Sequence, residues 1–339
     1  MGDGQWILID SCRGERRGLP LHLAYLQSLG VRESAVSHVV ISHWHDDHID
    51  GISEVVAACP NAKVVYSAAL TSQEFLSLVR LFSSRATDRQ DSGLREMIAV
   101  DRIIQERMTQ DGNRNRAACR TRADHRLWAR GGADADVQII ALSPSDGSIE
   151  RAHREISMML ERLSASPQSL VLPSTNRNHY SIVLWLQWHS ERVLLGGDLE
   201  VVADTGCGWK AVLSCNQFPD ARARIVKVAH HGSPNGDDPS IWEQLVAPDA
   251  VACLTSFTRG KTKRPAPEDL KRIRQFTSKV YATTLPRGSP SRRDNAVEKE
   301  LSALTKSRKA LNRNPGQIRI RWPQSQEPVV ETGGAALQV

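Results

Sequence analysis

The stretch Val39-Val40-Ile41-Ser42-His43-Trp44-His45-Asp46-Asp47-His48 decides how this chain is interpreted. Its first three residues are apolar and predict a buried strand, and the histidines follow where that strand ends. His43 and His45 are two residues apart, so they point the same way, whereas Asp47 and His48 lie on the turn that follows. Imidazole and carboxylate groups are ligands for zinc and neighbouring metals. Two pairs of such ligands can therefore serve two adjacent ions.

Ligand-type residues also follow two later predicted strands. Residues 193–195 are apolar and end in Gly196-Gly197-Asp198, and the strand at residues 224–229 ends in His230-His231. A binuclear centre needs one bridging carboxylate and one more imidazole besides the first motif. A Gly-Gly-Asp turn or a histidine pair is ambiguous alone, but the three motifs together indicate a metal site.

Strands and helices alternate along the chain. Apolar periodicity predicts strands at residues 5–10, 37–42, 62–66, 137–142, 180–188, 193–198 and 224–229, and helices at residues 21–29, 52–58 and 149–163. This order is typical of a layered α/β fold. We expect one domain over residues 1–325, with an Arg-rich helical insertion at about 71–132, a basic insertion at about 286–315 and a flexible tail at 326–339.

Composition narrows the class of protein. Of the 339 residues, 40% are hydrophobic, which suffices for a core, and none of the apolar runs approaches the roughly 20 residues of a membrane helix. The N-terminus lacks the pattern of a secretory signal, and the six cysteines show no C-x-x-C spacing, so we expect free thiols and a cytoplasmic location. The net charge of +6 favours anionic partners such as nucleic acid.

In their chain order, the motifs resemble those of the metallo-β-lactamase superfamily of metal-dependent hydrolases, with Asp10 at the first strand end completing the series. A closer likeness is to the soluble hydrolase domain of competence DNA-uptake channel (ComEC-type) proteins. The phrases that carry it are residues 178–184, 195–198 and 226–233. The likeness covers roughly residues 4–285, apart from the helical insertion, and a closing strand at residues 316–321.

The resemblance implies an αββα sandwich with a two-metal site at one edge. It implies that His43 and His45 hold one ion, that Asp198 bridges, and that Asp10 orients a ligand imidazole. The second ion would be held by three groups: Asp47, His48 and one histidine of the 230–231 pair.

Two assignments stay open. The superfamily supplies a further histidine for the first metal, and His179 is the nearest candidate, although competence-type domains have Asn or an acidic residue near that position. Either His179 is a ligand or water completes a loosely held first ion. His230 directly follows its strand, so it is favoured as the ligand, and His231, Asn178 and Ser233 are then placed to hydrogen-bond a substrate phosphate.

Two zinc or manganese ions would activate a bridging water as hydroxide and neutralise charge on phosphoryl oxygens, which suits phosphodiesters. Basic residues within 259–264 and 287–313 would neutralise backbone phosphates. We therefore expect a nuclease or phosphodiesterase that prefers single-stranded DNA, with Asp47, Asp198 and His231 in catalysis.

Two other functions are retained. One is a hydrolase of a small ester, lactone, amide or phosphorylated metabolite. The other is a non-catalytic nucleic-acid-binding or scaffolding module of a multi-protein system. β-Lactam cleavage is disfavoured, because a periplasmic enzyme would need an export signal.

Overall fold

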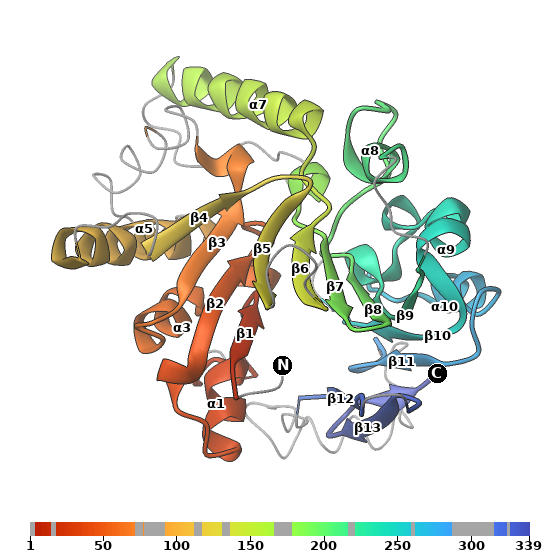
Figure 1. The fold of residues 1–339 in the computed structure, drawn as a ribbon. Coiled ribbons are helices and arrows are strands. Elements are labelled where there is room, and N and C mark those ends of the chain that lie inside the picture. Colours follow the sequence, from red (N-terminus) through yellow and green to blue (C-terminus); the bar gives the residue numbers. More distant parts are fainter. Residues whose placement is uncertain are drawn as a thin grey trace, which may run out of the picture.

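The computed structural model describes residues 4–14, 18–71, 77, 92–111, 117–130, 136–165, 178–215, 221–258, 262–286, 315–323 and 326–339. Within these residues the chain forms a four-stranded sheet, an eight-stranded sheet and a two-stranded ribbon. The two larger sheets lie face to face, with helices on their outer sides (Figure 1). This arrangement confirms the α/β sandwich that the resemblance implies.

The first sheet is parallel throughout. Its strands, in spatial order, are β1 (Trp6–Ile9), β2 (Val36–Ile41), β3 (Lys63–Ser67) and β4 (Ala118–Thr121). Four helices contribute buried residues to the core on its outer face: α1 (Leu21–Ser28), α3 (Ile52–Ala58), α5 (Ser92–Asp111) and α7 (Asp146–Ala165). Because β2 is covered on both faces, burial along it is nearly continuous, and its last three residues, Val39–Ile41, are all apolar.

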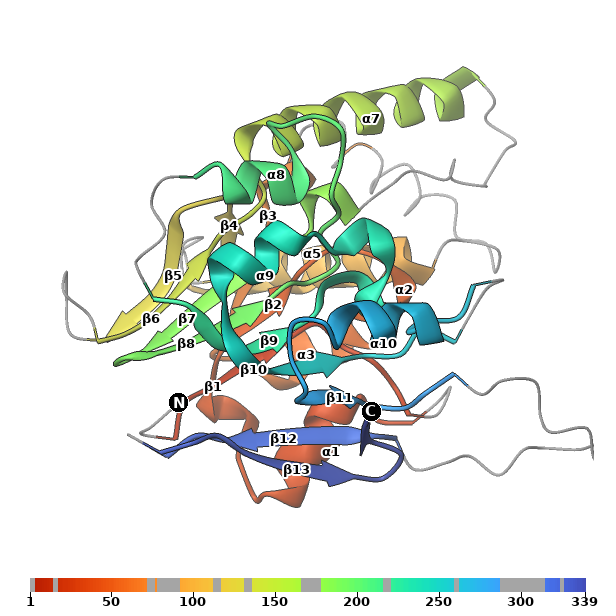
Figure 2. The same ribbon diagram turned by 90° about the vertical axis from the view of Figure 1, so that its right-hand side faces the viewer.

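The second sheet is mixed. Its strands, in spatial order, are β14 (Leu337–Gln338), β11 (Val280–Ala282), β10 (Val246–Leu254), β9 (Ala223–Lys227), β8 (Glu191–Leu195), β7 (Leu184–Trp188), β6 (Val137–Ala141) and β5 (His125–Arg130). Its outer face packs against α8 (Gly208–Leu213), α9 (Pro239–Leu245) and α10 (Pro267–Ile273). Figure 2 shows these helices in front of the sheet.

A third apolar core lies between the two sheets. Val40 and Val65 of the first sheet meet Ile139 and Leu184 of the second. The short helix α2 (Asp46–Ile49) and the 3-10 turns connect the strand ends, and the turns are η1 (Glu33–Ala35), η2 (Ala68–Thr71), η3 (Asn178–Tyr180), η4 (Ala229–Gly232) and η5 (Pro234–Gly236). Because this apolar core fixes the two sheets to each other, the loops that follow their strands have fixed positions relative to one another.

The expected helical insertion at about 71–132 needs correction at its end. Helix α5 lies in this segment, but β4 and β5 also do, each at an edge of a main sheet. Arg120, Arg126 and Arg130 are exposed on these edge strands. Charged side chains are typical of edge strands. The arginines of β4 and β5 made their sequence resemble the Arg-rich helix that precedes them.

The expected flexible tail at residues 326–339 also needs correction. Residues Val329–Gly333 form β13, which pairs with β12 (Gln317–Arg321), and β14 pairs with β11. The amide of Val339 donates to the carbonyl oxygen of Val280 at 2.8 Å. This segment is thus used for sheet pairing.

Two further expectations concern the rest of the chain. Most of the basic residues expected to contact phosphates, in 259–261 and 287–313, lie outside the described residues. Among the helices that the structure describes, none is both long and apolar enough to cross a membrane.

The core of the second sheet gives a stability prediction. Leu254 ends β10 with 0% exposure, next to the loop that contacts the candidate site. Leu254→Ala should lower the free energy of unfolding by about 2–5 kcal/mol, because burial is lost and a cavity remains. Leu19→Ala, at 43% exposure, should change it by less than about 0.5 kcal/mol. Urea denaturation of both variants tests this, and equal losses would contradict it.

Candidate metal site

The first motif is held by an aspartate from the neighbouring strand. Asp10 follows β1 in a left-handed conformation, with φ 59°. Its carboxylate accepts hydrogen bonds from the amide and the hydroxyl of Ser42, each at 2.7 Å. Ser42 is the residue directly after β2. Asp10 therefore fixes the point at which the chain leaves the sheet and enters the histidine motif.

The same carboxylate orients His48, which lies on α2. Nδ1 of His48 is 2.7 Å from Oδ2 of Asp10, so an Nδ1 proton is donated to the carboxylate. Nε2 of the ring then faces the other way, 3.2 Å from Oδ2 of Asp198 and 3.8 Å from Oδ2 of Asp47. A carboxylate behind an imidazole that fixes its orientation is the usual support for a metal-ligating histidine.

Asp198 reaches the site through a tight turn after β8. Gly197 has φ 52°, and a Cβ atom there would come within 2.6 Å of the carbonyl oxygen of Ile182 and of Oγ of Ser181. The position therefore requires glycine. The amide of Asp198 donates a hydrogen bond to Oγ of Ser181 at 3.1 Å, so this hydroxyl also holds the turn in place.

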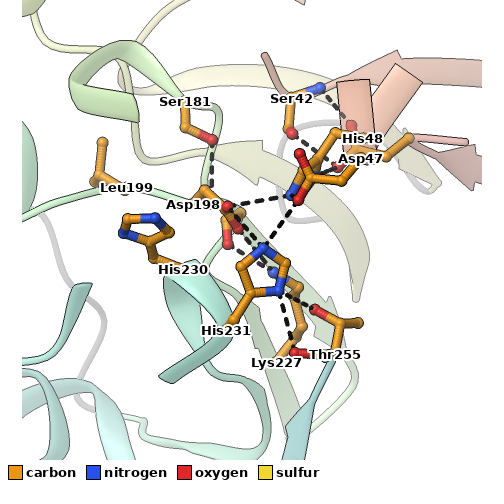
Figure 3. Close-up of polar contacts among 12 residues, drawn as sticks. Ser42, Asp47, His48, Ser181, Asp198, Leu199, Lys227, His230, His231 and Thr255 are labelled. Atoms are coloured by element: carbon orange, nitrogen blue, oxygen red, sulfur yellow. Dashed lines mark hydrogen bonds and ion pairs between the residues drawn. The ribbon is translucent and has the colours of Figure 1, made fainter. Parts of the chain in front are cut away.

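The histidine pair lies on a strained turn after β9. His230 and His231 have φ values of 45° and 55°, which side chains with a Cβ rarely adopt. Nδ1 of His231 is 3.1 Å from the carbonyl oxygen of Thr255, which directs Nε2 toward Asp47 at 3.0 Å and Asp198 at 3.3 Å. Figure 3 shows His231 between the two carboxylates and His230 turned away from them.

Four ligand atoms thus converge from three segments. Asp47, His48, Asp198 and His231 each offer one atom, and all four atoms lie within 4.8 Å of one another. A tetrahedral ion with bonds of about 2.1 Å would need ligand atoms roughly 3.4 Å apart. The four nitrogen-to-oxygen distances in the cluster are 3.0, 3.2, 3.3 and 3.8 Å. The side chains therefore fit a divalent metal in type, number and spacing.

The charges in the cluster favour a cation. Burial would raise the pKa of Asp47, but the hydrogen bond from His231 and the charge of His48 outweigh it and lower the pKa to about 2. Burial likewise opposes ionisation of Asp198, yet His48 and Lys227 hold its pKa well below the usual value. Both carboxylates are therefore anionic at neutral pH.

His43 and His45 form a separate pair beside the cluster. Nε2 of His43 is 3.1 Å from Nδ1 of His45. Burial, followed by the charges of His48 and His45, lowers the pKa of His43 well below its usual value, so this imidazole is neutral. Within the described residues, no third His, Cys, Asp or Glu atom completes a group with this pair.

His179 and His230, two expected ligands, lie apart from the four-residue cluster. His179 is buried, with Nε2 3.8 Å from Glu155 of α7. Nδ1 of His230 is 3.3 Å from Oε1 of Glu200. The preference for His230 over His231 is therefore reversed, because the left-handed turn carries the second histidine toward the carboxylates.

The two expected substrate contacts belong to the surroundings of Glu200. Asn178 donates from Nδ2 to Oε1 of Glu200 at 2.9 Å, and Asn235 does the same at 2.9 Å. The hydroxyl of Ser233 donates to Oδ1 of Asn235. These residues join η3 to the histidine turn, and contact of Asn178 and Ser233 with a substrate phosphate stays a prediction.

A cavity of about 740 Å³ opens onto the cluster. Asp47, His48 and His231 line one part of it, and half-buried apolar side chains from both sheets, such as Ile9 of β1 and Leu195 of β8, line another. Phe257 also lines the cavity, with its ring 5.4 Å from that of His231.

Lys227, another residue of the cavity wall, is missed by sequence reasoning. Its ammonium group is 2.6 Å from the carbonyl oxygen of Gly197 and 3.4 Å from Oδ1 of Asp198. A lysine within an apolar strand that ends at a ligand was the available signal.

The contact between Asp10 and His48 gives a prediction for metal affinity. Asp10→Asn removes the charge behind the imidazole and should weaken binding of Zn²⁺ by about 10- to 100-fold. Competition with a chromophoric chelator measures this. Asp124→Asn is a matched control, because Asp124 also has a left-handed backbone, with φ 63°. Equal affinities in the two variants would contradict the role of Asp10.

The ionisation of the two cluster histidines gives a pH prediction. Burial lowers the pKa of His48 and His231, but nearby carboxylates outweigh it and raise both above the usual 6.5. Without metal the rings therefore hold protons that an ion must displace. Metal affinity should rise as the pH increases through neutrality, with proton release. Calorimetry in buffers of different ionisation enthalpy measures this, and a pH-independent affinity would contradict it.

Comparison with known proteins agrees with the fold and the motifs. The model of the Metallo-beta-lactamase superfamily matches residues 2–103. ComE operon protein 3 of Bacillus subtilis (strain 168) is 25% identical over 150 residues, which are 44% of this chain and 18% of that protein. The match thus spans less than a fifth of this relative. These matches, together with the sandwich fold, make the chain similar to the metallo-beta-lactamase superfamily over residues 2–103 and similar in sequence to part of ComE operon protein 3.

Proposed function

We propose that the protein is a metal-dependent hydrolase that cleaves phosphodiester bonds, with single-stranded DNA as its preferred substrate. The observation that carries the hydrolase assignment is the convergence of Asp47, His48, Asp198 and His231 within 4.8 Å at the wall of a cavity. Zinc and manganese both accept such nitrogen and oxygen ligands. A divalent ion supplies a Lewis acid that activates water and offsets charge on phosphoryl oxygens.

The side chains have separate roles in this proposal. Asp47 and Asp198 supply the anionic oxygens that hold the ion, and Asp47 also faces the cavity from which water and substrate arrive. The Nδ1–H of His231 donates a hydrogen bond to the carbonyl oxygen of Thr255, which keeps Nε2 directed at the reacting centre. Phe257 packs beside that ring and reduces the access of water to it.

The cavity supports a flexible or small substrate. Its volume of about 740 Å³ is in the range of sites that enclose a small ligand. A nucleotide of a single strand can enter such a space, whereas a paired base is held in its duplex. The half-buried apolar side chains of Ile9 and Leu195 in the cavity wall suit contact with a base or another ring.

The choice of nucleic acid rests on two features besides the cavity. The net charge of +6 favours polyanions, and the resemblance to competence-type domains points to DNA. Binding through Lys and Arg would weaken as salt increases.

A small ester, lactone or phosphorylated metabolite is the second candidate substrate. The observation that favours it is the same cavity, because its apolar walls and limited volume also suit a compact molecule. The two candidates share the four-residue cluster and differ only in what fills the cavity.

A substrate panel with purified, metal-loaded protein tests the proposal. It contains single-stranded DNA, duplex DNA, RNA, a chromogenic phosphodiester, an ester, a lactone and a lactam. We expect turnover of single-stranded DNA to exceed that of duplex DNA, and chelation to abolish it. Asp47→Ala should lower turnover by at least about 100-fold, because removal of a ligand disrupts the cluster.

Asp136→Ala is the matched control, since this carboxylate is 80% exposed and lies 3.8 Å from Nδ1 of His189, away from the four-residue cluster. It should retain full activity. Turnover of the ester or lactone alone would replace the proposed substrate with the second candidate. DNA binding without turnover of any substrate in the wild-type protein would instead indicate a non-catalytic module.

A further inference from the structure

The two places at which the superfamily resemblance puts metal ions are unequal in this chain. Asp47, His48, Asp198 and His231 form a complete group of four ligand atoms. Beside it, His43 and His45 offer two imidazoles, 3.1 Å apart at their nearest nitrogens. Within the part of the chain that the structure describes, no third ligand atom joins this pair.

Lys227 adds a second difference between the two places. The two oxygens of Asp198 face different groups. Oδ2 lies 3.2 Å from Nε2 of His48 and 3.3 Å from Nε2 of His231, whereas Oδ1 lies 3.4 Å from the ammonium group of Lys227. The carbonyl oxygen of Gly197, 2.6 Å away, anchors the ammonium group. Figure 3 shows Lys227 extending past His231 toward Asp198.

A second divalent ion would have to share Asp198 with this lysine. A carboxylate that bridges two ions contributes to both, but here one of its oxygens already faces a cation. Like charges repel strongly at such short separations in a partly buried site. Any ion bound by His43 and His45 would therefore lose support from Asp198 or displace Lys227 from it.

We propose that the site binds one divalent ion tightly, through Asp47, His48, Asp198 and His231, and that Lys227 weakens binding of a second ion at the His43–His45 pair. This inference rests on the metal site of the proposed function, and it assigns Lys227 as a positioning residue for Asp198. The pair is then filled only at a higher metal concentration.

Metal counting on the full chain tests this without any substrate. The protein is stripped with a chelator, titrated with Zn²⁺ by calorimetry, and passed through metal-free gel filtration before its metal content is measured. Wild-type protein should retain one ion per chain, and the second dissociation constant should be weaker by at least about tenfold. Retention of two ions, or two equal sites, would overturn the proposal.

Variants separate the lysine from the ligands. Lys227→Met should raise retention to two ions per chain, whereas Lys227→Arg and the exposed control Lys271→Met should retain one. His45→Ala should lose only the weak site, and His231→Ala should lose the retained ion. One ion in folded Lys227→Met protein would overturn the role of the lysine. Lys227→Gln replaces it if the Met variant does not fold.

The outcome is independent of the proposed reaction. If one ion is retained but no substrate of the panel is cleaved, the proposed function fails and this inference stands. If DNA is cleaved but two ions are retained equally, this inference fails and the proposed function stands.

Discussion

The structure depends on two carboxylates, half-buried Asp47 and buried Asp198, that lie beside imidazoles from distant parts of the chain. Buried anions without partners cost several kcal/mol each. Here His48 and His231 approach both carboxylates, and Lys227 approaches Asp198. Since these groups lie after strands of both sheets, their mutual attraction requires the sheets to meet in one register. A metal ion is the counter-charge that such a set of anionic oxygens and imidazole nitrogens fits best.

The surroundings of the cluster hold it in place. Asp10 joins the end of β1 to Ser42 and His48, and Glu200 joins η3 to the histidine turn through Asn178 and Asn235. This second group supports a backbone that is left-handed at two successive residues, which costs conformational energy. The strained turn is what separates the two histidines, directing one toward the carboxylates and the other toward Glu200.

Much of this arrangement is predictable from sequence, because apolar strands and the residues that follow them are adjacent in the chain. The first motif, Asp198 and the α/β layers were predicted in this way. The choice between His230 and His231 was not, because it depends on φ values that periodicity does not encode. The edge strands β4 and β5 were hidden by exposed arginines, and pairing of β14 with β11 depends on contacts across more than 50 residues. The role of Lys227 could not be predicted either, because it depends on the distance between its ammonium group and Asp198.

The most direct test of the central claim is the position of a bound ion in a crystal of the zinc-loaded protein, measured by anomalous scattering at the zinc edge. The account predicts the strongest peak at the centre of Asp47, His48, Asp198 and His231, within about 2.0–2.2 Å of two imidazole nitrogens and two carboxylate oxygens. A strongest peak at His43 and His45, or at a cysteine, with none among the four residues, would contradict it.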